Sequence, residues 1–149
     1  MPRFPLLATV DLGSNSFRLQ ICAVEEGQLR IVDSIKEMVR FAAGLDENKN
    51  ITLDAQQRAL KCLSRFGQRL AGFKPEQVRV VATNTFRVAR NIASFLPQAE
   101  EALGFPVEII AGREEARLIY LGVKHTQPPT NDNMLVVDIG GGSTEFVIG

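Results

Sequence analysis

Short apolar runs separated by turns dominate the first forty positions of the chain. Residues 6–11 form an apolar run that ends at an aspartate, and residues 17–24 partly alternate between apolar and polar side chains. Such alternation is typical of a half-buried strand. A turn at 25–28 separates this segment from a third stretch at 29–39. The pattern predicts three consecutive strands that form an antiparallel meander.

Beyond residue 50 the spacing of apolar residues changes to that of helices. Apolar side chains from Leu53 to Leu70 recur along one face of a predicted helix, which Thr52 or Asp54 caps and which runs to about residue 71. Two more helices are predicted at 92–103 and 112–125, and Pro97 is expected to break or kink the first of these two. Between and after the helices, short apolar runs predict strands at 77–82, 106–111, 134–139 and 144–148.

The order of the predicted elements indicates a layered α/β domain followed by the start of another unit. Residues 127–133 contain two prolines and two asparagines, a composition typical of a linker. We therefore expect a first domain at 1–126, and a linker with the opening hairpin of a second domain at 127–149. Because the last apolar strand ends without a cap at Gly149, we infer a fragment of a longer protein.

A repeated motif carries the strongest functional signal. Residues 10–19 and 137–146 share one pattern: the apolar end of a strand, an aspartate, an aliphatic residue, a glycine, a small turn and a second strand. The two aspartates, Asp11 and Asp138, lie 127 positions apart, about the length of one domain. Small turns present successive backbone N–H groups that suit phosphate oxygens. One such turn is as readily an ordinary tight turn, but two copies a domain apart favour a pair of facing phosphate-binding hairpins.

This repeat resembles the paired hairpins of the actin, sugar-kinase and Hsp70 superfamily. Four motifs in order resemble, more closely, the exopolyphosphatase and guanosine pentaphosphate phosphohydrolase family. They are Asp-Leu-Gly-Ser-Asn-Ser-Phe at 11–17, Ala-Thr-Asn-Thr-Phe-Arg-Val-Ala-Arg-Asn at 82–91, Ile-Ala-Gly-Arg-Glu-Glu-Ala-Arg-Leu-Ile-Tyr at 110–120 and Val-Asp-Ile-Gly-Gly-Gly-Ser-Thr-Glu at 137–145. The resemblance implies a ribonuclease H-like domain of the actin and Hsp70 type, with a mixed sheet flanked by helices. It also implies that the chain is an N-terminal piece, because the family's members are at least twice as long.

The resemblance places the catalytic base at Glu115, the second glutamate of the Gly-Arg-Glu-Glu-Ala-Arg motif. Such a carboxylate takes a proton from the water that attacks a terminal phosphorus. Glu114 and Glu115 also stand in the first turn of a predicted helix, where acids complement the helix dipole. Asp138 and Glu145 are implied as further catalytic residues that hold Mg²⁺, which prefers oxygen ligands, or orient the water. Asp11 is expected to act similarly from the other side, and an exposed strand residue is the alternative for Glu145.

The remaining candidates are contacts to phosphate. Backbone N–H groups of the two turns are expected to donate to phosphate oxygens, and an arginine can fork two of them. Arg18 has an alternative interpretation as a surface arginine on an alternating strand. The predicted phosphate-binding residues are Asp11, Ser14, Asn15, Ser16, Arg18, Thr83, Arg87, Gly140, Gly141, Gly142 and Ser143.

Charge and composition narrow the class of protein. Seventeen basic residues balance seventeen acidic ones, so a dedicated nucleic-acid surface is not expected. The sequence contains no apolar run near the roughly 20 residues that span a bilayer and no signal-peptide pattern. Its two cysteines, Cys22 and Cys62, are far apart. We therefore expect a cytoplasmic protein without an integral membrane segment.

The leading hypothesis is an exopolyphosphatase, which hydrolyses the terminal phosphoanhydride of inorganic polyphosphate and releases orthophosphate. The alternative is the same chemistry on guanosine pentaphosphate, and a more distant one is a non-catalytic, actin-like binder of nucleotide or phosphate. A neutral chain is unexpected for a protein that binds a dense polyanion. Because each lobe is expected to supply one hairpin, the isolated chain should be inactive. The open edges of its last hairpin should dock onto its own domain or onto a second copy, giving a homodimer.

Overall fold

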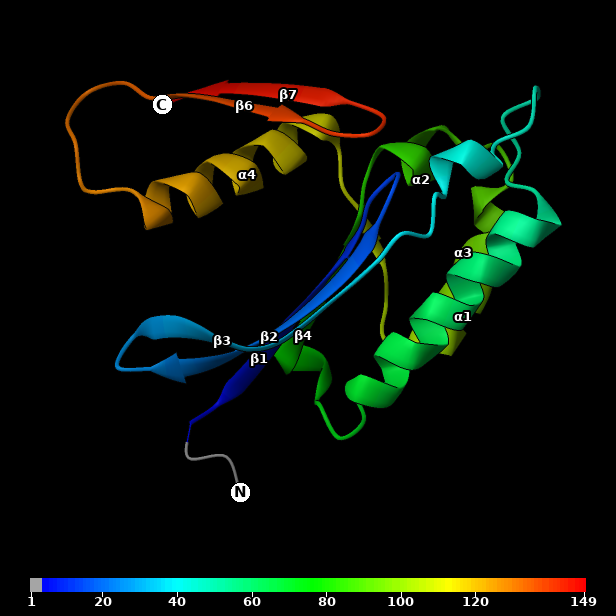
Figure 1. The fold of residues 1–149 in the computed structure, drawn as a ribbon, viewed down its shortest axis with the longest axis horizontal. Coiled ribbons are helices and arrows are strands. Elements are labelled where there is room, and N and C mark those ends of the chain that lie inside the picture. Colours follow the sequence, from blue (N-terminus) through cyan, green and yellow to red (C-terminus); the bar gives the residue numbers. More distant parts are fainter. Residues whose placement is uncertain (1–3) are drawn as a thin grey trace.

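A five-stranded sheet with the strand order β3-β2-β1-β4-β5 forms the centre of the computed structural model, which describes residues 4–149 (Figure 1). A separate two-stranded sheet pairs β6 with β7. The strands are β1 (Leu6–Leu12), β2 (Phe17–Glu25), β3 (Gln28–Glu37), β4 (Val78–Ala82), β5 (Glu108–Ile109), β6 (Leu135–Ile139) and β7 (Thr144–Ile148). The helices are α1 (Leu53–Arg69), α2 (Asn84–Val88), α3 (Ile92–Leu103) and α4 (Gly112–Thr126), with short 3₁₀ turns at Ala42–Gly44 and Pro75–Gln77.

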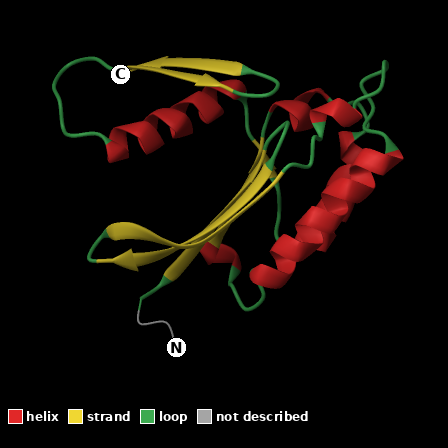
Figure 2. Ribbon diagram, in the orientation of Figure 1, coloured by secondary structure: helices red, strands yellow, loops and turns green. Residues whose placement is uncertain are grey.

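The central sheet is mixed, as the sequence predicts. Strands β1, β2 and β3 form an antiparallel meander, whereas β4 runs parallel to β1 and β5 runs parallel to β4. Helices α1 and α3 pack against each other and cover one face of this sheet, while α4 lies on the other side beside the β6–β7 hairpin (Figure 2). None of the helices described over residues 4–149 is long and apolar enough to cross a membrane.

The hydrophobic core lies between the sheet and the α1–α3 layer. Alternate residues of β1 and β2 are buried there, including Val10 and Leu19, both fully inaccessible to solvent. The phenylalanines Phe17, Phe41 and Phe86 pack together at the site end of this core, and the rings of Phe41 and Phe86 have centroids 4.9 Å apart. Because Phe17 begins β2 directly after the first small turn, burial of its side chain fixes the position of that turn.

Three details differ from the prediction. The expected break at Pro97 is wrong, because α3 continues through it as one helix. Pro97 has no N–H to donate to the carbonyl of Ala93, four residues earlier. Ala93 is exposed, so water can hydrogen-bond that carbonyl instead. The strand predicted at 106–111 contracts to β5, and Pro106 at its predicted start has no N–H to donate to a ladder. Helix α2 was not predicted, because five residues are too few to show a helical period.

The β6–β7 hairpin packs one face against α4 and exposes the other. Val136 lies on the inner face and is 8% exposed. The outer face carries apolar side chains that are between 45% and 79% exposed, namely Leu135, Val137, Ile139, Phe146 and Ile148. The hairpin therefore docks onto its own chain through one face, which is one of the two arrangements expected from the sequence.

Candidate active site

Two small turns meet at the centre of the site. One follows β1 at residues 13–16, and the other follows β6 at residues 140–143. The N–H of Gly13 donates to the carbonyl of Ser16 at 3.1 Å, and the N–H of Gly140 donates to that of Ser143 at 2.9 Å. Because these residues occupy equivalent places in the sequence repeat, the repeat is also a repeat of backbone structure.

The close approach of the turns depends on glycine. A Cβ atom added to Gly141 would lie 2.3 Å from the side-chain nitrogen of Asn15. One added to Gly142 would lie 2.5 Å from the amide nitrogen of Asn84 and 2.7 Å from the hydroxyl of Ser14. The same Asn84 amide donates a 2.8 Å hydrogen bond to the carbonyl of Gly142. A side chain at either position would force these polar side chains to move, so glycine is what lets the second turn lie against the first.

Hydrogen bonds from other segments fix the first turn without using its own backbone N–H groups. The N–H of Arg40 donates to the carbonyl of Asn15 at 2.7 Å, and Thr85 donates through its hydroxyl to that of buried Ser14 at 2.7 Å. Within residues 4–149, no hydrogen bond engages the N–H groups of residues 14–16 or of residues 141–143. Successive unengaged N–H groups of this kind form an anion-binding concavity.

A pocket of about 290 Å³ opens between the two turns. It brings together most of the residues that the sequence nominated. These lining residues are Asp11, Ser14, Asn15, Ser16, Thr83, Glu115, Asp138, Gly140, Gly141, Gly142 and Ser143. Lys36 and Met38 of the β3 region also line it and were not predicted, because only strand pairing brings them there.

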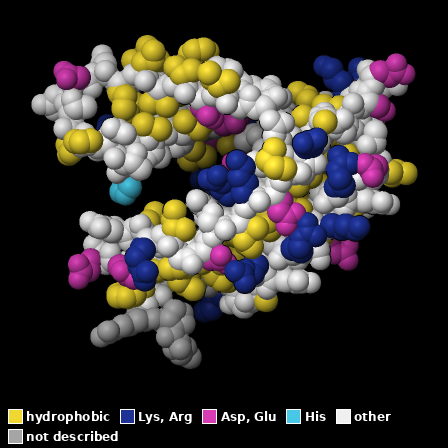
Figure 3. Space-filling model, viewed as in Figure 1, with side chains coloured by type: hydrophobic (Ala, Val, Ile, Leu, Met, Phe, Trp, Pro, Cys, Tyr) yellow, Lys and Arg dark blue, Asp and Glu magenta, His cyan; other side chains and the backbone are white. Residues whose placement is uncertain are grey.

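Arg18 and Arg87 lie outside this pocket. Arg18 lines an adjoining groove of about 580 Å³ between the sheet and α4, seen in Figure 3 as the hollow between the two halves of the molecule. Arg87 stands behind the site. Its guanidinium donates to the carboxylate of Glu115 at 2.8 Å and to the carbonyl of Ile110 at 2.8 Å. The structure therefore makes Arg87 a partner of Glu115 and does not bring it to the expected phosphate.

The acidic residues of the site influence one another. Asp138 and Glu145 occupy directly opposite positions on β6 and β7, on the face toward α4. Burial raises the pKa of Glu115, the hydrogen bond from Arg87 opposes this rise, and the charges of Glu145 and Asp11 add to it. Burial also raises the pKa of Asp11; the positive charge of Arg18 lowers it, and the negative charge of Asp138 raises it further. A carboxylate with a raised pKa is a better proton acceptor than an ordinary glutamate.

Glu145 is buried rather than exposed, with 8% of its surface accessible. Its Oε2 atom is buried and has no hydrogen-bond partner. Over residues 4–149 no group of three or more His, Cys, Asp or Glu side chains is arranged to hold a metal ion. Mg²⁺, however, is commonly bound by one or two carboxylates together with substrate phosphates. The facing pair of Asp138 and Glu145, with an oxygen left unpaired, fits that mode of binding.

A mixed sheet flanked by helices, with two equivalent hairpins whose turns face each other, defines a ribonuclease H-like domain of the actin type. Residues 20–149 match the model of the Ppx/GppA phosphatase family, and the chain therefore belongs to that family. The fold class predicted from the sequence is confirmed.

Solved structures support this assignment. An exopolyphosphatase from Cytophaga hutchinsonii is 31% identical and aligns with 97% of this chain at a TM-score of 0.88. The PPX-GPPA enzyme of Aquifex aeolicus is 33% identical and aligns with 97% at a TM-score of 0.85. The chain spans 46% and 49% of these two proteins, about half their length. The ethanolamine utilization protein EutJ of Carboxydothermus hydrogenoformans, at 14% identity and a TM-score of 0.51, shares the fold alone.

The contact between the turns makes a testable prediction for Gly141. In the full-length protein, Gly141→Ala should weaken binding of inorganic tripolyphosphate by about tenfold, because the added Cβ would push apart the two turns that hold the phosphate. Overpacking of this kind typically costs about 1–3 kcal/mol. Calorimetric titration and urea unfolding measure binding and stability separately. Gly122→Ala in α4 is the control, because its Cβ meets nothing within 4 Å. Lower stability of Gly141→Ala with normal binding would show that this glycine serves folding alone.

Proposed function

We propose that the full-length protein is an exopolyphosphatase, which hydrolyses the terminal phosphoanhydride of inorganic polyphosphate and releases orthophosphate. Membership in the Ppx/GppA phosphatase family supports a phosphohydrolase. The observation that carries the proposal is the placement of Glu115 in a pocket lined by two turns with unengaged N–H groups. Phosphate release from polyphosphate and from guanosine pentaphosphate, measured with the full-length protein and Mg²⁺, tests it.

Binding is the first step of the proposed mechanism. Backbone N–H groups of residues 14–16 and 141–143 hold the oxygens of the terminal phosphate from two sides. Donors that are fixed before the substrate arrives stabilise the charge of the transition state without reorganising. The hydroxyl of Thr83, which also lines the pocket, is a further contact.

Proton transfer is the second step. The carboxylate of Glu115 accepts a proton from water as that water attacks the terminal phosphorus, and the bond to the bridging oxygen breaks. Arg87 holds this carboxylate in one orientation through its 2.8 Å hydrogen bond. Enzymes of this family generally use divalent metal ions. Asp138 and Glu145 would hold Mg²⁺ here, where it would neutralise charge on the substrate's phosphates.

Guanosine pentaphosphate is the second candidate substrate. The groove beside the pocket shares Asp11, Glu115 and Asp138 with it, so a ligand can occupy both. Its walls include Leu118 and Ile119, and those apolar side chains suit a purine better than they suit a phosphate chain. Faster turnover of the nucleotide than of polyphosphate would assign this substrate, and binding without hydrolysis of either would assign a non-catalytic binder.

Several expectations from the sequence belong to this proposal. We propose that residues 1–126 are the first domain and that residues 127–149 are a linker and the opening hairpin of the second. A cytoplasmic location, no nucleic-acid partner and a homodimeric state complete the proposed description.

Glu115→Gln should lower kcat by about 10²- to 10⁴-fold, the usual effect of losing a general base. Substrate affinity should be kept, because the amide has the same shape but cannot accept the proton. Steady-state kinetics and calorimetry on the full-length protein measure both. Glu114→Gln is the matched control, since Glu114 is paired with exposed Arg117. Equal loss in both variants would assign the effect to the helix rather than to a base.

Arg87→Met should move the acid limb of the kcat/KM profile to higher pH. The reaction requires ionised Glu115, and Arg87 lowers the pKa of that carboxyl, so its loss leaves burial and the neighbouring acids to raise it. The pH dependence of kcat/KM measures the shift. Arg117→Met, which removes the partner of Glu114, should leave the limb where it is. A limb that moves to lower pH would contradict the role of Arg87.

The isolated 149-residue chain should have little or no phosphatase activity. The chain carries the turns of both hairpins but only the first hairpin of the second lobe. That β6–β7 hairpin exposes Phe146 and Ile148 on an uncovered face, and its edges are open. Light scattering should therefore find dimers or larger species. A monomer that hydrolyses polyphosphate briskly would contradict the requirement for two complete lobes.

A further inference from the structure

The two hairpins of the repeat carry opposite charges at one equivalent position. In the second hairpin, Asp138 stands directly opposite Glu145. In the first hairpin, the equivalent Asp11 stands directly opposite Arg18. The second hairpin thus offers two carboxylates, which suit a cation. The first replaces one of them with a guanidinium, which suits an anion.

A third strand extends this row in the first hairpin. Lys36 on β3 is directly opposite Arg18 on β2. Opposite residues on antiparallel strands share a face, so Asp11, Arg18 and Lys36 form one row across three strands. Lys36 lines the pocket between the turns, Arg18 lines the groove beside it, and Asp11 lines both. The row therefore leads from the acidic centre of the site to the edge strand of the sheet.

A β-bulge places Lys36 in this row. Near the β2–β3 turn, Cys22 pairs with Ile31, and this register continued would put Ile35 opposite Arg18. The register shifts by one residue between Ile21 and Cys22, and Lys36 takes that position instead. Without the shift, Lys36 would belong to the opposite face of the sheet, toward the core. Bulges next to active sites commonly redirect a side chain in this way.

The charges of Arg18 and Lys36 are not neutralised by ion pairs with the described residues. Neither Arg18 nor Lys36 forms an ion pair with another side chain of residues 4–149. Like charges directly opposite on neighbouring strands destabilise a sheet. Lys36 is also the one lysine or arginine among the described residues that line the pocket, which contains three carboxylates. A polyanion that bridges the two cations would relieve their repulsion.

We propose that Lys36 extends the phosphate contact already expected at Arg18 into a subsite for the phosphates that are not transferred, a role that rests on the proposed hydrolase function. The terminal phosphate lies between the two turns, and the rest of the anion crosses β2 and β3 toward the edge of the sheet. Two neighbouring cations in this row would also allow a chain with a formal charge of zero to bind a polyanion.

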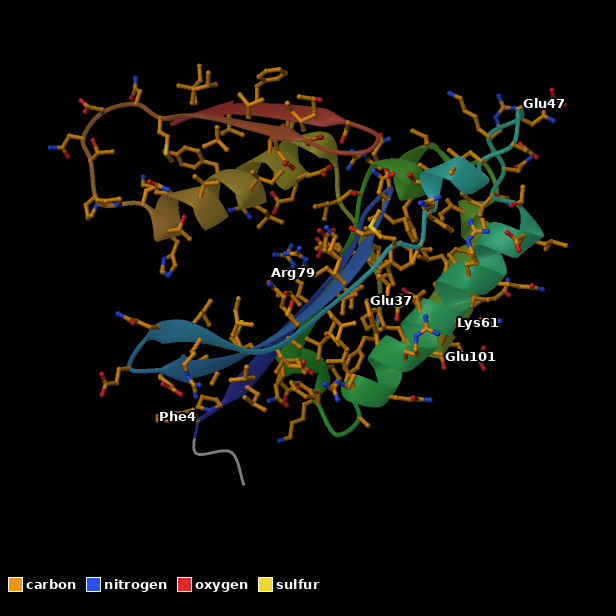
Figure 4. All side chains as sticks on the ribbon, in the orientation of Figure 1. Phe4, Glu37, Glu47, Lys61, Arg79 and Glu101 are labelled. Atoms are coloured by element: carbon orange, nitrogen blue, oxygen red, sulfur yellow. The ribbon has the colours of Figure 1, made fainter. Side chains whose placement is uncertain are left out.

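The test compares Lys36→Gln with Lys61→Gln in the full-length protein. Lys61 is an exposed lysine on α1, on the side of the sheet away from α4 (Figure 4). With tripolyphosphate as substrate, Lys36→Gln should raise KM about 10- to 100-fold, the usual effect of losing a charged hydrogen bond, and change kcat little. Its free form should unfold at the same or a higher urea concentration than the wild type, because the repulsion is gone. Lys61→Gln should change neither value.

Affinity for tripolyphosphate, measured by calorimetry in a Glu115→Gln background, separates this proposal from the proposed function. A wild type that hydrolyses neither polyphosphate nor guanosine pentaphosphate overturns the function, while a weaker affinity in Lys36→Gln still supports the subsite. An active wild type with the same KM and affinity in both lysine variants overturns the subsite alone. A Lys36→Gln variant that binds weakly and also unfolds earlier than the wild type overturns it too, since Lys36 would then serve the fold.

Discussion

The site depends on the contact between two turns that carry almost no side-chain volume. Gly141 lies against Asn15, and Gly142 lies against Ser14 and Asn84, so closely that a Cβ atom at either glycine would displace those side chains. Because of this contact, the residues of both turns line one pocket, and Glu115 near the start of α4 lines it with them. A wider separation would leave each turn with a weak, half-formed anion site.

The electrostatics of the site follow from the same repeat. Two hairpins with one backbone pattern carry an Asp–Arg pair and an Asp–Glu pair, so one favours an anion and the other a cation. Burial and the charge of Asp138 raise the pKa of Asp11, and burial with the charges of Glu145 and Asp11 raises that of Glu115, where the hydrogen bond from Arg87 limits the effect. A chain without net charge can thus present a strongly polarised site.

Much of this arrangement is predictable from the sequence, because it is local. The meander, the three longer helices and both hairpin turns follow from apolar spacing and small residues, and their motifs already indicate the fold and the family. What escapes prediction is non-local. Lys36 joins the site through a one-residue register shift that no local pattern reveals, and Arg87 turns toward Glu115 because helix α4 brings that carboxylate within reach. Glu145 is buried by packing on α4, which a strand pattern alone does not show.

The proposed mechanism requires the terminal phosphate to lie between the two turns. A crystal structure of the full-length protein with Mg²⁺ and a non-hydrolysable, imido-bridged triphosphate tests it most directly. We expect oxygens of the terminal phosphate to accept hydrogen bonds from N–H groups of both residues 14–16 and residues 141–143, with a water held by Glu115. An analogue bound to only one turn, or held away from Glu115, would contradict it.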